Sequence, residues 1–356
     1  MIRIKIITFI TGISLSLSTL SQTCPQGVKP DGFDIIVVAG QSNAVGSGVV
    51  SGNGYRNINT NRDHRIFQLG RWGNHDQAIL SGSRRRLEHV PHHGQSNVNL
   101  SKKGFGIPFA RLYAINNLCR NRRVLIIPVA KGSTSMMTWD SEIDLFKPIR
   151  KNGTDYPLLD SHFLFNDMKS RINYALQQNS GNRLVAFLWQ QGEADILTMA
   201  GSQSWQLQHL STNQSYNVPE HRSLFRTKFA NMKKELRAHF GFKFVFLAGL
   251  VSEDWVFWHK RKTNQILNNG CHQIDGNKSV NITNSRRMIN NQIKIVADNG
   301  AKSGHVRTNH IQRNHTVTKS DGRSSDCGLG ANIHFSAHGH KVLARRYYQK
   351  YQQLNN

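Results

Sequence analysis

The sequence predicts an α/β fold in which helices cover both faces of a parallel sheet. Short apolar runs rich in β-branched residues recur at 35–39, 124–130 and 184–189, and such runs are typical of strands buried on both sides. Segments with the apolar spacing of amphipathic helices separate these runs. This alternation favours right-handed crossover connections, which bring the carboxyl ends of the strands to one edge of the sheet.

Each of the other elements is expected from its local pattern. Pro108 begins a helix with apolar positions at Phe109, Leu112, Tyr113 and Ile115. Residues 50–105 are polar and lack periodicity, so we expect a lid or a surface insertion there. The remaining expected elements are a helix at 163–178 with Phe165, Met168, Ile172 and Leu176 on one face, a helix at 221–239, a strand at 242–251, a helix at 285–298 and a last helix at 338–353 with Val342, Leu343, Tyr347 and Tyr351 on one face.

The N-terminus has the pattern of a secretory signal peptide. Arg3 and Lys5 precede an apolar core at 6–20, which is too short for a membrane span. We expect a signal peptide at 1–22, one domain at 28–356, and a secreted, periplasmic or extracellular protein without a membrane span after cleavage. The four cysteines, Cys24, Cys119, Cys271 and Cys327, suggest disulfides in that setting, but three pairings are possible and the sequence does not choose among them.

The chain is strongly basic. Its 46 Lys and Arg residues against 21 Asp and Glu residues give a formal net charge of +25. A charge of this size favours anionic partners such as acidic glycans, cell envelopes or nucleic acid. No helix-turn-helix, zinc-finger or RNA-binding motif accompanies the charge, so we expect no specific nucleic-acid binding.

Three expected strands end in small polar loops, at 40–46, 131–135 and 190–195. These loops should converge, because open α/β sheets gather their ligands at the carboxyl edge. Acyl transfer needs a nucleophile, a base and donors for the developing oxyanion. Ser42 in the first loop is the candidate nucleophile, and His334, which precedes the last helix, is the candidate base.

The candidate oxyanion donors come from the same loops. The backbone N–H groups of Ser42 and Gly132 and the side-chain amide of Gln191 could all face a developing negative charge.

At these positions the chain resembles SGNH hydrolases. The residues that carry the resemblance are Gly40-Gln41-Ser42-Asn43, the loop Gly132-Ser133-Thr134 followed by Trp139, Trp189-Gln190-Gln191-Gly192-Glu193, and His334-Phe335-Ser336 with Gly339. Within that superfamily it resembles the branch of sialate O-acetylesterases and the acetylxylan esterases of carbohydrate esterase family 6. The resemblance covers about 33–350. It implies a flavodoxin-like three-layer α/β/α sandwich and hydrolysis of O-acetyl esters on carbohydrate, without metal or cofactor.

The resemblance also implies roles for individual residues. Ser42 would be the nucleophile and His334 the base, and Ser42, Gly132 and Gln191 would form the oxyanion hole. Residues beside these positions, Gln41, Asn43 and Trp139, are expected to bind substrate.

One position departs from the family pattern. The family usually has an Asp three residues before the catalytic His, and this chain has Ala331 there. We expect Glu193 as the third catalytic residue; Asp195 and Asp326 are alternatives, as is a backbone carbonyl that holds the ring in a Ser–His dyad.

Three other functions compete with the esterase. His334, His338 and His340 with nearby acids suggest a zinc site, but His338 and His340 fall on different helical faces. The Ala331 departure and the high charge suggest an inactive SGNH-fold module that binds acidic glycans. Gly40, Gly46 and Gly48 lack the spacing of a nucleotide-binding loop, which makes that function the weakest.

Overall fold

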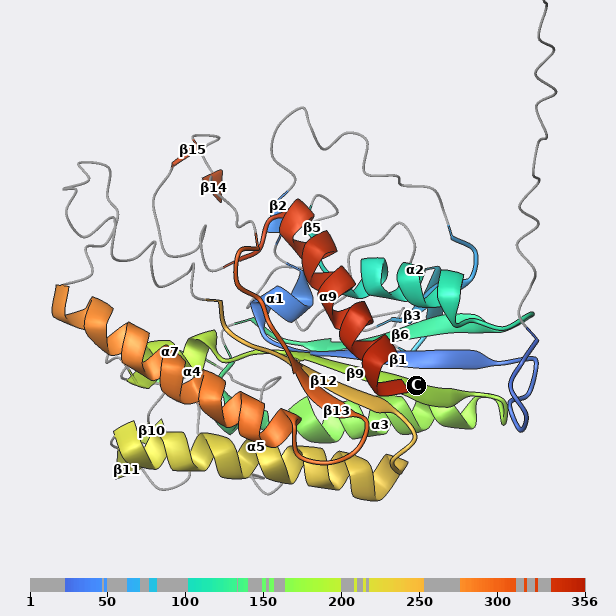
Figure 1. Ribbon diagram of the computed structural model, residues 1–356. Coiled ribbons are helices and arrows are strands. Elements are labelled where there is room, and N and C mark those ends of the chain that lie inside the picture. The colour runs from blue at the N-terminus through green and yellow to red at the C-terminus, as the bar shows by residue number, and fades with distance from the viewer. Residues whose placement is uncertain are drawn as a thin grey trace, which may run out of the picture.

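The computed structural model describes residues 23–46, 48–49, 63–70, 77–81, 102–132, 134–139, 149–151, 154–156, 164–199, 208–209, 214–215, 218–252, 276–311, 317–318, 324–325 and 334–355. At its centre lies a seven-stranded sheet in the order β13–β12–β9–β1–β6–β3–β4 (Figure 1). The strands are β1 (Phe33–Gly40), β3 (Ile66–Leu69), β4 (Ile79–Ser81), β6 (Arg123–Ala130), β9 (Arg183–Gln190), β12 (Val245–Gly249) and β13 (Ser303–Val306). All neighbours pair in parallel except β3 and β4, so the predicted parallel sheet is confirmed and carries one antiparallel edge strand.

Helices cover both faces of the sheet. In Figure 1, α2 (Gly106–Asn116) and α9 (Ala337–Asn355) lie on one side, and α3 (Leu164–Gln177) and α5 (Val218–Phe240) lie on the other. The helix α7 (Gly276–Ala297) packs against α5, β12 and β13, and α4 (Glu193–Met199) packs against α7. The three-layer α/β/α sandwich is therefore confirmed.

Short elements complete the fold. They are the helix α1 (Ser42–Val45), the 3-10 helix η3 (Met136–Trp139) and four antiparallel pairs: β2 (Gly48–Val49) with β5 (Lys102–Lys103), β7 (Ile149–Lys151) with β8 (Thr154–Tyr156), β10 (Gln208–His209) with β11 (Gln214–Ser215), and β14 (Val317–Thr318) with β15 (Ser324–Ser325).

The apolar run of β1 is explained by burial on both of its faces. Ile35, Val37 and Ala39 join the core under α3, α5 and α7, whereas Ile36 and Val38 join the core under α2 and α9. Successive side chains of a strand point to opposite faces, so a strand between two helical layers needs an apolar residue at every position.

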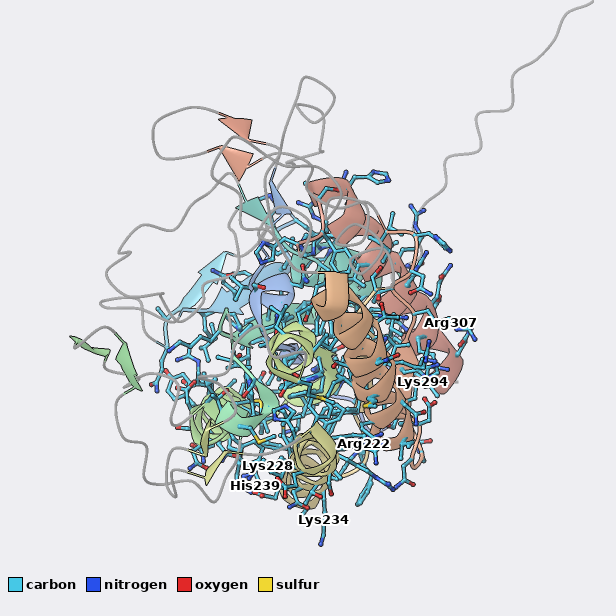
Figure 2. The ribbon with its side chains drawn as sticks, turned by 90° about the vertical axis from the view of Figure 1, so that its left-hand side faces the viewer. Arg222, Lys228, Lys234, His239, Lys294 and Arg307 are labelled. Carbon is cyan, nitrogen blue, oxygen red and sulfur yellow. A yellow bond between two sulfur atoms is a disulfide. The ribbon has the colours of Figure 1, made fainter. Side chains whose placement is uncertain are left out.

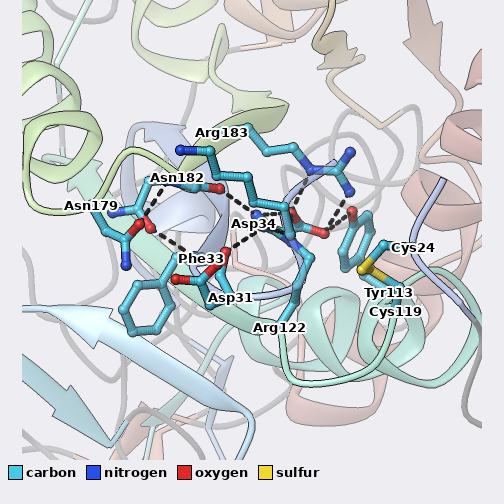
Figure 3. Close-up of polar contacts among 12 residues, drawn as sticks. Cys24, Asp31, Phe33, Asp34, Tyr113, Cys119, Arg122, Asn179, Asn182 and Arg183 are labelled. Atoms are coloured by element: carbon cyan, nitrogen blue, oxygen red, sulfur yellow. Dashed lines mark hydrogen bonds and ion pairs between the residues drawn. A yellow bond between two sulfur atoms is a disulfide. The ribbon is translucent and has the colours of Figure 1, made fainter. Parts of the chain in front are cut away.

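A charged residue interrupts this pattern at the amino-terminal end of β1. The carboxylate of Asp34 is fully buried and accepts hydrogen bonds from Tyr113 Oη at 2.6 Å, Arg122 Nε at 2.9 Å and Arg183 Nε at 2.6 Å (Figure 3). Burial, and then the charge of Asp34, raises the pKa of Tyr113 well above its usual value. This network joins β1, α2, β9 and the residue directly before β6 at the edge opposite the candidate site.

A disulfide lies beside this network. Cys24 and Cys119 are bonded across 95 residues of sequence, which settles the first of the cysteine pairings left open by the sequence. Cys271 and Cys327 lie outside the described residues, as does the expected signal peptide at 1–22. Among the described helices, none has a stretch long and apolar enough to cross a membrane.

Several element boundaries differ from those expected. The polar stretch 50–105 contributes β3 and β4 to the sheet, so it is not wholly an insertion. The strand expected at 242–251 is β12, which is shorter than expected, and Phe242 before it is exposed. The helix α7 begins nine residues earlier than expected. Ile115 is exposed to solvent rather than packed in the core. The buried faces predicted for α3 and α9 are confirmed: Phe165, Met168, Ile172, Leu343, Tyr347 and Tyr351 are buried, and Leu176 and Val342 are half-buried against the core.

Candidate functional site

The first three loops meet at the carboxyl edge of the sheet, as expected. The backbone N–H of Gln41 donates to Gln190 O at 3.0 Å, and the N–H of Lys131 donates to Gly40 O at 2.9 Å. Gly40 has a φ of +127°, and a Cβ built there would lie 2.2 Å from Gln190 O. Only glycine fits this close approach of β1 and β9, which sets the direction in which the chain leaves β1.

Ser42 opens α1 directly after this turn and is partly exposed. The helix is a single turn, closed by Gly46, whose N–H donates to Ser42 O at 3.1 Å and whose φ is +93°. The candidate nucleophile thus lies at the carboxyl end of β1, a central strand of the sheet, where the sequence placed it.

Asn43 connects the Ser42 turn to two distant segments. Its Nδ2 donates to Glu193 Oε1 at 2.7 Å, and its Oδ1 accepts from the backbone N–H of Phe335 at 3.1 Å. The Asn43 side chain is fully buried, so these bonds are shielded from water. The first bond ties α1 to the start of α4, and the second brings the residue after His334 beside the residue after Ser42.

The helix α9 is fixed by two further contacts, one at its start and one in its middle. Ser336 Oγ accepts from the N–H of Gly339 at 3.0 Å, which caps the helix two residues after His334. Tyr347 Oη donates to Trp189 O and lies 3.0 Å from Gln190 Oε1, which binds α9 to the end of β9. Burial raises the pKa of Tyr347 well above its usual value, so this residue stays a hydrogen-bond donor.

The loop that contains Gly132 is held from two sides. Thr134 Oγ1 donates to Lys131 O at 2.9 Å across the turn, and Gln191 Nε2 donates to Thr134 O at 3.1 Å. Gln191 Nε2 also donates to Asp195. Both N–H groups of the Gln191 amide are therefore engaged within the protein, and a contribution of Gln191 to an oxyanion hole would require one of these bonds to be exchanged.

Asp195 is the centre of a second buried network. Its carboxylate accepts the backbone N–H of Met136 at 3.0 Å, bonds the Gln191 amide and lies 3.1 Å from His221 Nε2. Both Asp195 and His221 are fully buried. These contacts commit Asp195 to the start of η3 and to α5, rather than to His334. Nothing in the sequence signalled His221, which lies in the first turn of α5.

The three expected substrate-binding residues are largely enclosed. Gln41 Oε1 accepts from the backbone N–H of Ala194 at 3.2 Å. Trp139 packs edge-on against Trp189, with ring centroids 4.8 Å apart, and neither Trp139 nor Asn43 is exposed. A contact of Trp139 or Asn43 with substrate would require an element to move, so these roles stay predictions.

The histidines that suggested a zinc site lie on α9 and just before it. Within the described ranges no three His, Cys, Asp or Glu residues form a group that could hold a metal ion. His338 is exposed and His340 is fully buried, in line with their expected places on different faces of α9. Ala331 and Asp326 lie outside the described residues.

A comparison with protein-family models identifies one family. The sequence profile described as "Carbohydrate esterase, sialic acid-specific acetylesterase" matches residues 32–215, a range that includes Ser42, Gly132 and Glu193 but ends before His334. No curated protein sequence matches the chain at a significant level.

Solved structures with the same fold exist at low sequence identity. The crystal structure of NanS is similar with a TM-score of 0.50 and 18% identity, covering 92% of this chain and 98% of NanS. A protein from Arabidopsis thaliana is similar with a TM-score of 0.50 and 14% identity, covering 90% of this chain and 98% of its own. At these identities the likeness shows the fold alone.

Proposed function

Because this chain belongs to the sialic acid-specific acetylesterase family of carbohydrate esterases, we propose that it is a serine esterase that removes O-acetyl groups from carbohydrate by Ser42–His334 acyl transfer. The observation that carries the proposal is the position of Asn43, which bonds the backbone next to His334 while itself following Ser42. The substrate is an O-acetylated sugar or polysaccharide, and the proposed mechanism uses no cofactor and no metal.

The chemistry follows the usual order of acyl transfer. His334 takes the proton of Ser42 as the hydroxyl oxygen attacks the acetyl carbonyl carbon. His334 then gives this proton to the sugar oxygen as its bond to the acetyl carbon breaks. Water, deprotonated by His334, attacks the acetyl-enzyme, and acetate leaves as Ser42 regains its proton.

The negative charge on the carbonyl oxygen needs fixed donors. We assign this role to the backbone N–H groups of Ser42 and Gly132, which belong to the turns at the carboxyl ends of the neighbouring strands β1 and β6. Gln191 is the third proposed donor, on condition that its amide exchanges its bond to Thr134 or Asp195 for one to substrate.

Glu193 is proposed to act on His334 indirectly, through Asn43. Its described hydrogen bond holds Asn43 Nδ2, and Asn43 in turn holds the backbone beside His334. We therefore propose that Glu193 is a positioning residue whose carboxylate completes the Ser42–His334 site. It would take over the role that the family pattern gives to an Asp at position 331.

Export is part of the proposal. The disulfide between Cys24 and Cys119 is of a kind that persists in oxidising compartments, and it lies just after the expected signal peptide. We propose a secreted or periplasmic enzyme. The high positive charge favours one second candidate, a catalytically weak module of the same fold that binds acidic glycans.

The decisive experiment compares the mature chain with Ser42→Ala and with the control Ser223→Ala, an exposed serine on α5. Acetate release from acetylated xylan and from a small acetyl ester is measured for all three proteins, with circular dichroism as the check on folding. We expect Ser42→Ala to lose at least about a thousandfold in kcat and Ser223→Ala to lose nothing. Full activity in a folded Ser42→Ala protein would refute the nucleophile, and absence of activity from all three folded proteins would favour the binding module.

A further inference from the structure

Positive charge is concentrated in the segments that form α7, β13 and α9. Residues 276–311 and 334–355 contain a single acidic residue, Asp298, and α9 contains none. Against it stand ten basic residues: Lys278, Arg286, Arg287, Lys294, Lys302, Arg307, Lys341, Arg345, Arg346 and Lys350. The excess is far greater than the roughly two-to-one ratio of the whole chain, so the charge is not spread evenly.

These segments adjoin at one edge of the sheet. The strand β13 is the edge strand, and both α7 and α9 pack against it. Arg346 Nη1 on α9 donates to Arg307 O at 3.1 Å and to Asn309 O at 2.6 Å, just past the end of β13. Lys350 lies across the strand, because a Cβ built on Gly304 would come within 2.6 Å of its Cε.

We call six of the exposed and partly exposed basic side chains of this region the basic edge: Lys294, Arg307, Lys341, Arg345, Arg346 and Lys350. Figure 2 shows Lys294 and Arg307 pointing outward on the same side of the molecule.

No carboxylate of the described residues neutralises the basic edge. Asp298 is engaged with His305, whose Nδ1 lies 2.8 Å from Asp298 Oδ2. The guanidinium of Arg346 is directed to backbone carbonyls, which satisfy its hydrogen bonds but not its charge. Several uncompensated cations on one surface produce a strong positive potential that attracts a polyanion.

The basic edge also leads toward the candidate site. The helix α9 begins three residues after His334, and its exposed positions include His338, Lys341 and Arg345. These residues are three and four positions apart, a spacing that places them along one face of a helix. Lys341 and Arg345 lie about 6 Å apart along the axis, so charges are spaced along a line away from His334.

We propose that the basic edge binds an acidic polysaccharide, a sugar chain that carries carboxylates, and guides it to the edge of the sheet where Ser42 lies. The choice of a carbohydrate polymer rests on the proposed function, whereas the anionic character of the partner rests on the charge alone. A nucleic acid would satisfy the charge equally, but the chain shows no nucleic-acid motif.

The test measures binding to polygalacturonate without acetyl groups, so that its result does not depend on esterase activity. The edge variant combines Lys294→Gln, Arg307→Gln, Lys341→Gln and Arg345→Gln, all at exposed positions. The matched control removes four exposed charges elsewhere, by Arg222→Gln, Arg226→Gln, Lys234→Gln and Lys243→Gln. Both are made in the full chain, with and without Ser42→Ala.

We expect the edge variant to bind at least about tenfold more weakly than wild type at low salt, with a shallower dependence on salt, and the control to stay within about threefold. Ser42→Ala should leave the affinity unchanged. Equal losses in both quadruple variants would overturn the proposal, because net charge alone would then explain binding. Tighter binding of duplex DNA than of polygalacturonate, lost in the edge variant, would also overturn it in favour of a nucleic-acid partner.

Discussion

The side-chain oxygen of Asn43 accepts a hydrogen bond from the backbone N–H of Phe335 across 292 residues of sequence. Each of these residues follows a proposed catalytic residue directly, Ser42 in one case and His334 in the other. A single buried amide therefore fixes the distance between the two turns that carry the nucleophile and the base. Glu193 holds the other end of the same amide, so three segments depend on one side chain.

The first prediction concerns this amide. Asn43→Asp keeps an acceptor for Phe335 but turns the donor that faces Glu193 into a second carboxylate, at the 2.7 Å separation of the present bond. Two carboxylates at this distance repel each other, so the turns should shift. We expect kcat to fall by about a hundredfold with KM little changed, because misplaced catalytic groups lower the rate while a buried residue does not bind substrate.

A second substitution separates positioning from catalysis. In Asn43→Asp with Glu193→Gln, the new amide can donate to the new carboxylate and restore the bond. We expect most of the lost kcat to return in the double variant, and Glu193→Gln alone to stay within about tenfold of wild type. A loss of about ten-thousandfold in Glu193→Gln alone, unrelieved in the double variant, would show instead that His334 needs the charge of Glu193 directly.

The second prediction concerns Asp195. In Asp195→Asn, an NH₂ group takes the place of one carboxylate oxygen. This group must face one of the present partners of Asp195, which are Met136 N–H, the Gln191 amide and His221. We expect a loss of about 1–3 kcal/mol in the free energy of unfolding, measured in urea, because hydrogen bonds to a buried charged acceptor are replaced by weaker bonds to a neutral amide. The control Asp298→Asn, whose partner His305 is near the surface, should change stability by less than about 1 kcal/mol. An equal effect of the two substitutions would contradict the buried network.

The third prediction concerns the opposite edge of the sheet. Asp34→Asn removes the charge that faces the buried guanidinium of Arg122, whose side chain is 0% exposed. An uncompensated buried charge should lower the free energy of unfolding by about 3–5 kcal/mol. Asp63→Asn is the matched control, since Asp63 also bonds an arginine, but Arg65 is 46% exposed there. That variant should lose less than about 1 kcal/mol.

The sequence predicts those parts of the fold whose residues carry their own signal. The strand β1 was predictable because its residues 35–39 are all apolar, as burial on two faces requires. The strand β13, Ser303–Val306, has no such run, and its place comes from α7 and α9 packing against it. The strand β3 has only four residues within a polar stretch, too few to show a period.

The site was predictable only as far as its loops. Strand ends in a parallel sheet share an edge, so the convergence of the turns at Ser42, Gly132 and Gln191 followed from topology. Which side chains bond one another did not follow. The contact of His221 with Asp195, and those of Arg122 and Arg183 with Asp34, join separate segments with no characteristic spacing.

The fourth prediction is a pH dependence of stability. Lys233 Nζ is buried at the end of α7, where it donates to Val296 O at 2.7 Å and to Asn299 O at 2.6 Å. Burial, and then the neighbouring charge of Arg237, lowers the pKa of Lys233 from 10.5 to about 8. Between these two values the unfolded chain holds a proton that the folded protein has released, so raising the pH favours the folded state.

The measurement is the difference in the free energy of unfolding between wild type and Lys233→Met, at pH 7 and at pH 9.5. Loss of the hydrogen bonds gives a difference at both pH values, whereas the ionisation of Lys233 adds a part that changes with pH. We expect wild type to gain roughly 1–2 kcal/mol relative to Lys233→Met over this range. Relative to Lys234→Met, a substitution at an exposed neighbouring position on α5, wild type should show no such gain between pH 7 and pH 9.5. A constant difference between wild type and Lys233→Met would mean that Lys233 keeps its charge in the folded protein, because the helix carbonyls stabilise the ammonium against its burial.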